Sequence, residues 1–225
     1  MAGLDSKTGD TIIELRGIKF GYTPERVVFN GLDIMLKKDE KAALTGHNGS
    51  GKTTLFHIIM GLVEPWEGTV SVFGNQCKTR QDFYQVRRRV GLLFQDPDDQ
   101  LFSPTVEEDV AFGPLNLGRT RAQAKKIVFR TLELLGMQGY EKRITYRLSE
   151  GEKRLVALAT VLAMEPEVLL LDEPVSGLDE QHRERFIQVL QTYNHTCMVI
   201  SHDQDFLNRV IQRRYVLHNG FICSK

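Results

Sequence analysis

The chain has 225 residues and balances 29 Lys and Arg against 29 Asp and Glu. This length suits one large domain, and a formal net charge of zero gives no electrostatic reason to expect nucleic acid or an anionic membrane surface as a partner. Its 3 cysteines are widely spaced, which is typical of reduced thiols in a cytosolic protein and argues against a disulfide or zinc framework. No apolar run approaches about 18 residues, so we expect any membrane role to act through a partner.

The first ten residues are small and polar, and we expect a flexible tail over 1–10 ahead of a single domain over 11–225. Apolar and polar residues alternate from Thr11 to Phe20 and predict a strand. Tyr22 follows it; this aromatic ring either stacks on an adenine or lies at the edge of the core. The apolar run Lys41 to Thr45 predicts a buried strand that leads into a glycine-rich loop.

That loop reads GHNGSGKTT and fits G-x-x-x-x-G-K-[ST], a pattern whose backbone N–H groups cradle phosphates. Its glycines leave those N–H groups unobstructed. Lys52 supplies a positive charge for the β- and γ-phosphates, and the Thr53 hydroxyl a ligand for Mg²⁺. The next residues favour a helix whose N-terminus faces the anion. This context disfavours a chance match and predicts a nucleotide site formed by Gly46, His47, Asn48, Gly49, Ser50, Gly51, Lys52, Thr53 and Thr54.

The middle of the chain changes in character. A second apolar strand is expected from Val90 to Gln95, and Gln95 taken alone is a solvated strand end. The region 104–147 has helical periodicity instead. Thr120 and Gln123 form a capping box ahead of a helix that stops at Gly136. We expect a small helical insert between two parts of a sheet.

A second capping box, Ser149 with Glu152, opens the amphipathic run LSEGEKRLVALATVLAM. Two interpretations stay open at this point. It is an ordinary capped helix, or its N-terminus is a second clamp for phosphate.

Two continuous apolar runs, VLLLDEP and CMVISHD, suit strands covered on both faces in a mostly parallel sheet. Asp172, Glu173 and His202 fall at the carboxyl ends of these strands, where ligands bind in open α/β sheets. Asp172 is a candidate for holding Mg²⁺ and Glu173 for polarising the attacking water. His202 is either a structural histidine or a contact to the γ-phosphate.

These motifs, in this order over nearly the whole chain, resemble the ATP-binding cassette (ABC) ATPases. GHNGSGKT resembles the Walker A motif, VLLLDE the Walker B motif, and LSEGE the signature motif LSGGQ. The resemblance implies a P-loop NTPase of the α/β class with a mostly parallel sheet, an antiparallel β subdomain and a helical subdomain at about 96–164. It places Gln95 at the Q-loop, residues 176–179 at the D-loop, His202 at the switch histidine and Tyr22 at the adenine.

The same resemblance implies how the site works. ATP and Mg²⁺ are the expected cofactors, with Glu173, His202 and Gln95 as catalytic residues and Thr53, Gln95 and Asp172 around the metal. A head-to-tail dimer, formed by two copies or by a paired ATPase subunit, is expected to sandwich ATP. Ser149, Gly151 and Asp179 are then expected to contact the nucleotide of the other subunit.

The implied partners are integral membrane subunits of a transporter, with the chain peripheral at the cytoplasmic face of the cell membrane and no nucleic acid bound. Residues 95–118 and 155–174 resemble more narrowly the energising subunits of cobalt/nickel and energy-coupling-factor importers. Residues 95–118 then predict a docking face for the membrane partner, although an ordinary linker is the alternative. Uptake of cobalt or nickel is the expected function, with energy-coupling-factor vitamin import as the alternative.

The signature departs from the usual pattern at two positions. Glu152 replaces glutamine and completes the capping box, while Glu150 replaces glycine. Because a carboxylate near a triphosphate repels it, we expect Glu150 to point outward or to meet a basic group of the partner subunit. An ABC ATPase acting on DNA or ribosomes is disfavoured by the lack of a coiled-coil insertion or second cassette. A module that binds ATP without hydrolysis is disfavoured by Glu173 and His202.

Overall fold

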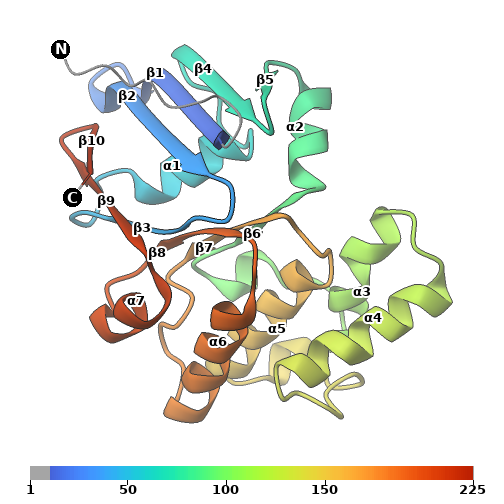
Figure 1. The fold of residues 1–225 in the computed structure, drawn as a ribbon. Helices are drawn as coiled ribbons and strands as arrows, with labels where there is room; N and C mark the ends of the chain where they lie inside the picture. The colour runs from blue at the N-terminus through green and yellow to red at the C-terminus, as the bar shows by residue number, and fades with distance from the viewer. Residues whose placement is uncertain (1–10, 225) are drawn as a thin grey trace.

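The computed structural model describes residues 11–224, so the tail expected at 1–10 lies outside the described residues. This part of the chain is layered, with two sheets, one helix between them and further helices beyond the larger sheet (Figure 1). The strands are β1 (Thr11–Thr23), β2 (Arg26–Lys37), β3 (Lys41–Thr45), β4 (Glu67–Val72), β5 (Asn75–Cys77), β6 (Val90–Leu93), β7 (Val168–Asp172), β8 (Thr196–Ile200), β9 (Arg213–His218) and β10 (Phe221–Ser224). The helices are α1 (Lys52–Ile59), α2 (Arg80–Arg87), α3 (Val106–Asn116), α4 (Arg121–Leu134), α5 (Glu150–Leu162), α6 (Glu180–Thr192) and α7 (Gln204–Val210), with 3-10 turns η1 (Pro97–Asp99) and η2 (Thr145–Arg147).

The larger sheet has the strand order β10-β9-β3-β8-β7-β6 and is parallel except for its edge strand β10. Every residue of β7 and β8 is buried. Alternate side chains pack on opposite faces: Ala43 and Leu169 meet the layer of α5, α6 and α7, while Ala42 and Leu170 meet α1 and the other sheet. Burial on both faces explains why the apolar runs are continuous.

The smaller sheet is antiparallel, in the order β2-β1-β4-β5. Strand β1 confirms the strand expected from Thr11 to Phe20 and continues to Thr23. Its buried residues Leu15 and Ile18 share a core with Phe56 of α1, which lies between the two sheets (Figure 1). The end of β1 and the start of β2 therefore lie beside the loop that precedes α1.

Between β6 and β7 the chain forms η1, α3, α4, η2 and α5. The capping boxes expected at Thr120 and Ser149 are both present. Strand β6 ends at Leu93, whereas the sequence predicts a strand that reaches Gln95. The Phe94 N–H donates to the Gln100 side chain at 3.1 Å, which ends the ladder and takes Gln95 out of the sheet.

The predicted fold class is confirmed: a mostly parallel sheet, an antiparallel sheet and a helical insert. The limits of a helical subdomain at about 96–164 stay a prediction. Within residues 11–224, no helix is both long enough and apolar enough to cross a membrane.

Candidate nucleotide site

The glycine-rich loop joins the end of β3 to the start of α1, at the carboxyl edge of the parallel sheet. Gly51 has a φ of 103°, and a Cβ there would lie 2.5 Å from Val28 Cγ1, so only glycine fits. Gly46 has a φ of 149°, and a Cβ there would lie 2.4 Å from the Leu217 carbonyl oxygen. These two glycines let the loop turn against β2 and β9.

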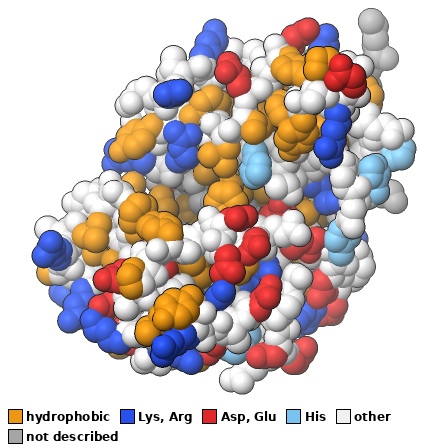
Figure 2. Space-filling model, turned by 180° about the vertical axis from the view of Figure 1, so that it is seen from behind, with side chains coloured by type: hydrophobic (Ala, Val, Ile, Leu, Met, Phe, Trp, Pro, Cys, Tyr) orange, Lys and Arg blue, Asp and Glu red, His pale blue; other side chains and the backbone are white. Residues whose placement is uncertain are grey.

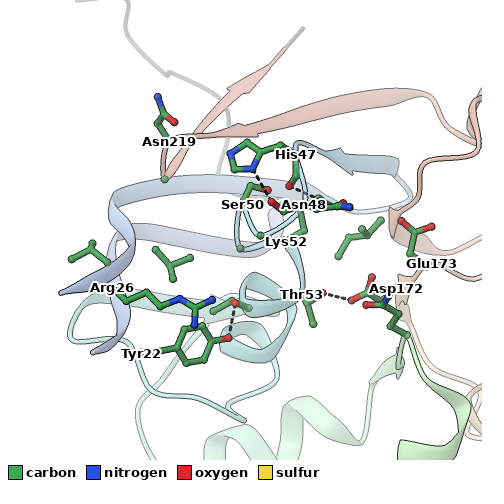
Figure 3. A pocket seen from close by; sticks show the side chains of 18 of the residues that line it. Tyr22, Arg26, His47, Asn48, Ser50, Lys52, Thr53, Asp172, Glu173 and Asn219 are labelled. Atoms are coloured by element: carbon green, nitrogen blue, oxygen red, sulfur yellow. Dashed lines mark hydrogen bonds between the residues drawn. The ribbon is translucent and has the colours of Figure 1, made fainter. Parts of the chain in front are cut away.

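Lys52 folds back over this loop (Figure 3). Its Nζ donates to the Gly46 oxygen at 2.9 Å and to the His47 oxygen at 3.1 Å. Burial lowers the pKa of the ammonium, and the neighbouring Glu173 and Asp172 carboxylates oppose that shift. Ser50 Oγ is buried without a hydrogen-bond partner among the described residues. The loop therefore presents a partly desolvated cation whose present partners are carbonyl oxygens, an arrangement suited to exchange for phosphate.

Asp172, the last residue of β7, meets the loop from the neighbouring part of the sheet. The Thr53 hydroxyl donates to Asp172 Oδ2 at 2.5 Å, as Figure 3 shows. Asp172 is only 3 % exposed, and burial raises its pKa, with the Thr53 hydrogen bond acting in the opposite direction. A hydroxyl and a carboxylate are thus paired where the sequence predicted the metal ligands.

Glu173 follows β7 with a φ of 46°, in the left-handed region, while its N–H donates to the Ile200 oxygen at 2.8 Å. The side chain thereby turns toward His202: Glu173 Oε1 lies 3.5 Å from His202 Nε2, and Oε2 accepts the His202 N–H at 3.4 Å. Burial raises the pKa of Glu173, with His202 opposing.

The buried Arg154 of α5 holds the backbone that carries Glu173. Its Nη1 donates to the backbone oxygen of Glu173 and to the backbone oxygen of Gln95, each at 3.0 Å. One guanidinium therefore fixes the backbone of both segments that carry predicted catalytic residues.

Tyr22 lies at the other end of the loop. Its hydroxyl is 2.9 Å from Thr54 Oγ1, and the Arg26 guanidinium carbon is 5.5 Å from the ring centroid. The residue is 54 % exposed, so the tyrosine is at the surface and offers area for stacking.

These groups surround one cavity of ≈ 940 Å³, within the volume that ligand sites of about 300–1,000 Å³ occupy. The predicted site residues that line it are Tyr22, His47, Asn48, Gly49, Ser50, Gly51, Lys52, Thr53, Thr54, Gln95, Asp172, Glu173 and His202. Sequence reasoning placed Ser176 in the D-loop but not at this cavity, and it missed Arg26, Val27, Val28, Asn30, Ile200, Asn219 and Gly220. The Asn-Gly pair is a hairpin-turn signal, but nothing local to it indicates that this turn lies beside the loop.

The predicted signature residues do not line this cavity, and of the predicted D-loop residues 176–179 Ser176 alone does. Ser149 is the N-cap of α5, and its Oγ accepts the Glu152 N–H at 3.3 Å. Gly151 lies beside the D-loop, because a Cβ there would be 3.6 Å from the Gly177 oxygen. Asp179 caps α6, accepting the His182 N–H at 2.9 Å and lying 2.7 Å from its Nδ1. All three therefore lie outside the cavity built on the loop of their own chain.

The two unusual signature residues have separate partners. Glu152 accepts from the Ser149 N–H at 2.7 Å and from Tyr140 and Arg143 at 2.8 Å each. Burial opposes its charge, yet these hydrogen bonds outweigh burial and lower its pKa to about 2. Glu150 points outward, with 74 % of its side chain exposed and Oε1 3.7 Å from Arg154 Nη2 of the same chain.

Comparison with known proteins agrees with this geometry. The chain matches the ABC transporter family over residues 29–176. A putative ABC transporter ATP-binding protein of Nitratidesulfovibrio vulgaris is 46% identical over 96% of this chain and 80% of its own length. The energy-coupling factor transporter ATP-binding protein EcfA of Methanothermobacter thermautotrophicus is 40% identical over 95% of this chain and 70% of its own.

Among solved structures, CbiO1 of Clostridium perfringens, part of the ABC transporter complex CbiONQ, superposes with a TM-score of 0.83. It is 32% identical and the match covers 95% of this chain and 87% of that one. The ATP-binding cassette MJ0796, solved as a dimer bound to ADP and Pi, shares the fold with a TM-score of 0.87 at 23% identity, over 95% of this chain and 98% of its own. The chain therefore belongs to the ABC transporter family, as an ATPase domain that binds and hydrolyses ATP.

Proposed function

We propose that the chain energises an ABC importer, coupling ATP hydrolysis to the uptake of a transition metal ion, cobalt or nickel, through separate membrane subunits. The arrangement that carries the ATP-hydrolysis part of this proposal is the carboxylate pair Asp172–Glu173 facing Thr53 and His202 across one cavity with the phosphate loop. In this role the chain works at the cytoplasmic face of the cell membrane, where its membrane partners anchor it.

Each predicted residue then has a chemical task. Lys52 and the loop N–H groups bind the phosphates, and Tyr22 stacks on the adenine. Glu173 accepts a hydrogen bond from the attacking water and thereby polarises that water, while His202 contacts the γ-phosphate. Gln95 reaches the same cavity beside them.

The residues present also suit Mg²⁺, which would lower the charge of the phosphates when bound. Thr53 and Asp172 would hold it, with Gln95 nearby. Among residues 11–224, no three His, Cys, Asp or Glu side chains gather into a metal cage. That agrees with Mg²⁺, which keeps waters and substrate phosphates as most of its ligands and takes only one or two from the protein.

Half of the ATP site is proposed to come from a second ATPase subunit, either another copy or a paired relative. Ser149, Gly151 and Asp179 lie outside the cavity of their own chain, although the first turn of α5 is built as a capped helix N-terminus. A head-to-tail dimer places that N-terminus against the phosphates bound by the other subunit, where backbone N–H groups favour anions.

The docking face for the membrane subunits is proposed on residues 95–118, within a helical subdomain at about 96–164 of the single domain 11–225. Phe102 and Phe112 are 67 % and 50 % exposed, and their rings meet edge to face with centroids 4.8 Å apart. Seen from behind, the helical side of the molecule carries exposed hydrophobic side chains among charged ones (Figure 2). An exposed aromatic pair with a charged surround is typical of an interface.

The docking face is tested by Phe102→Ala with Phe112→Ala in the purified transporter complex. We expect stimulation of ATP turnover by the membrane subunits to fall while turnover of the isolated chain stays unchanged. Phe129→Ala is the matched control, because Phe129 is an exposed phenylalanine of α4, outside 95–118, at 53 % exposure. Equal loss in the control and the double variant would contradict the assignment.

The transported substrate is tested with the complex in proteoliposomes, measuring uptake of Co²⁺ and Ni²⁺ with ATP on the side of this chain. We expect ATP-dependent accumulation that Glu173→Gln abolishes. Energy-coupling-factor vitamin import is the second candidate, favoured by the 40% identity to EcfA. Uptake of a vitamin with neither metal would establish that alternative instead.

A further inference from the structure

Arg183 of α6 holds the start of α7, and the two helices lie side by side (Figure 1). Its Nε donates to Asp203 Oδ2 and its Nη2 to Asp203 Oδ1, both at 3.0 Å. Nη2 also donates to Asp205 Oδ2 at 2.8 Å. Only 14% of the Arg183 side chain is exposed, so this two-pronged pair is largely shielded from water. A bidentate guanidinium–carboxylate pair fixes orientation as well as distance.

Asp203 organises the backbone around it. Its Oδ1 accepts the Phe206 N–H at 2.9 Å, which makes it the N-cap of α7, and its own N–H donates to Ser201 Oγ at 3.2 Å. The hydrogen bond from Arg183, the largest cause, keeps the pKa of Asp203 low, so the carboxylate stays charged. The backbone on both sides of residue 202 is thus held in place by Asp203, which bonds to Ser201 on one side and to Phe206 on the other, and Asp203 is itself held by Arg183.

His202 needs that support because its own contacts are weak. Its side chain is 58% exposed and lies 3.5 Å from Glu173, and its N–H donation to Glu173 is long at 3.4 Å. No shorter contact holds the imidazole among the described hydrogen bonds. The position of the ring therefore depends on where the 201–203 backbone lies.

The other end of Arg183 connects to the D-loop. Its backbone N–H donates to the Asp179 oxygen at 2.9 Å, in the first turn of α6. One residue thus joins Asp179, which is proposed to face the second subunit, to the segment that carries His202. This turn of helix and this ion pair therefore connect the two segments.

We propose that Arg183 is a positioning residue for ATP hydrolysis: by clamping Asp203 it holds His202 against Glu173 and ties that contact to the D-loop at Asp179. The inference rests on the proposed roles of Glu173 and His202. Arg183 touches neither the loop nor the cavity, so its loss is expected to slow turnover without weakening ATP binding.

The chain contains a matched control. Arg209 of α7 forms a bidentate pair with Glu184 of α6, at 2.6 and 2.8 Å, between the same two helices. It makes no hydrogen bond to Asp203 among the described residues. Arg183→Ala and Arg209→Ala each remove one such pair between α6 and α7, and only the first releases Asp203.

The experiment measures phosphate release and equilibrium ATP binding on the full chain, with thermal midpoints recorded for every variant. For Arg183→Ala we expect kcat to fall by about 10-fold or more, with the ATP dissociation constant within about twofold. Arg209→Ala is expected to keep kcat within about twofold. Arg183→Lys, which keeps the charge but loses the fork, is expected to recover part of the rate.

Asp203→Asn guards against a variant that fails to fold, because asparagine is also a good N-cap and keeps α7 started. It should reproduce the loss of kcat. Equal kcat in Arg183→Ala and Arg209→Ala, or a normal kcat in Asp203→Asn, overturns the inference. His202→Ala distinguishes failure of the proposed function from failure of the inference. Normal turnover in His202→Ala would contradict the proposed role of His202 itself. Slow turnover in His202→Ala, together with normal turnover in Arg183→Ala, would reject only the inference about Arg183.

Discussion

Glu173 and His202 are in contact at two points: Glu173 Oε2 accepts the backbone N–H of His202, and Glu173 Oε1 lies near the imidazole nitrogen Nε2. One carboxylate therefore contacts both the main chain and the side chain of the same residue. The left-handed φ of 46° at Glu173 makes this possible, because it turns the side chain toward β8. Backbone strain of this kind persists where surrounding contacts enforce it, and here the N–H bond to Ile200 and the Arg154 bond to the Glu173 oxygen do so.

We predict that Glu173→Gln keeps ATP binding and loses hydrolysis. The amide has nearly the same size but cannot act as a base, and loss of general-base catalysis costs about 10²–10⁴-fold in rate. Phosphate release under saturating ATP measures the rate, and equilibrium binding measures the affinity. Turnover within a few fold of the native chain would falsify the role assigned to Glu173.

Several site residues were predictable because their signal is contiguous. The glycine loop, the Asp172–Glu173 pair and the Ser149 capping box each combine a local pattern with a predicted strand or helix, and the structure forms all three elements. His202 was predictable through its strand end, because the carboxyl ends of parallel strands share one edge of the sheet.

Other features depend on contacts that no local pattern encodes. Asn219 reaches the cavity because β9 pairs with β3, and Asn30 because β2 passes beside the loop. The early end of β6 depends on a side chain six residues away, Gln100, which takes the N–H of Phe94. In the sequence, Arg154 looks like an ordinary polar residue on a helix. Only the packed structure shows that its guanidinium donates to the backbone oxygens of Gln95 and Glu173.

We predict that Glu150→Gly changes turnover in the transporter complex by less than about threefold. The side chain is 74% exposed and its partner Arg154 keeps its backbone contacts without it; an exposed ion pair contributes about 0–1 kcal/mol. Phosphate release with the membrane subunits present is the measurement. A gain of about tenfold or more, equivalent to about 1.4 kcal/mol, would mean that Glu150 slows the native site.

We predict opposite pH dependences of stability for two carboxylates. Burial raises the pKa of Glu173, so the folded state binds its proton more tightly than the unfolded state does, and stability is lost as pH rises from about 4.5 through the raised value. Glu173→Gln removes that loss. In the nucleotide-free chain its thermal midpoint should exceed the native one at pH 8, and the difference should shrink toward pH 5.

Glu152 has the reverse sign and serves as the comparison. Its pKa is lowered to about 2, so it stabilises the fold above the unfolded pKa and loses that contribution as pH falls from about 4.5 toward 2. Glu152→Gln should lower stability at pH 8 by about 1–2 kcal/mol, after allowance for solvent screening. The same sign of effect in both variants at pH 8 contradicts the prediction.

Asp109 gives the last prediction, because it is a carboxylate at 2 % exposure inside the helical part of the chain. Oδ1 accepts the Phe102 and Ser103 N–H groups at 3.1 and 2.9 Å, and Oδ2 the Thr145 hydroxyl at 3.2 Å, so it joins the proposed docking face to η2, just before Ser149. Asp109→Ala leaves these donors without partners and should lower the free energy of unfolding by about 2–4 kcal/mol in urea titrations. Asp109→Asn keeps an oxygen for both N–H groups and should lose clearly less. Equal losses in the two variants would show that charge, and not the hydrogen-bonded backbone, is what Asp109 provides.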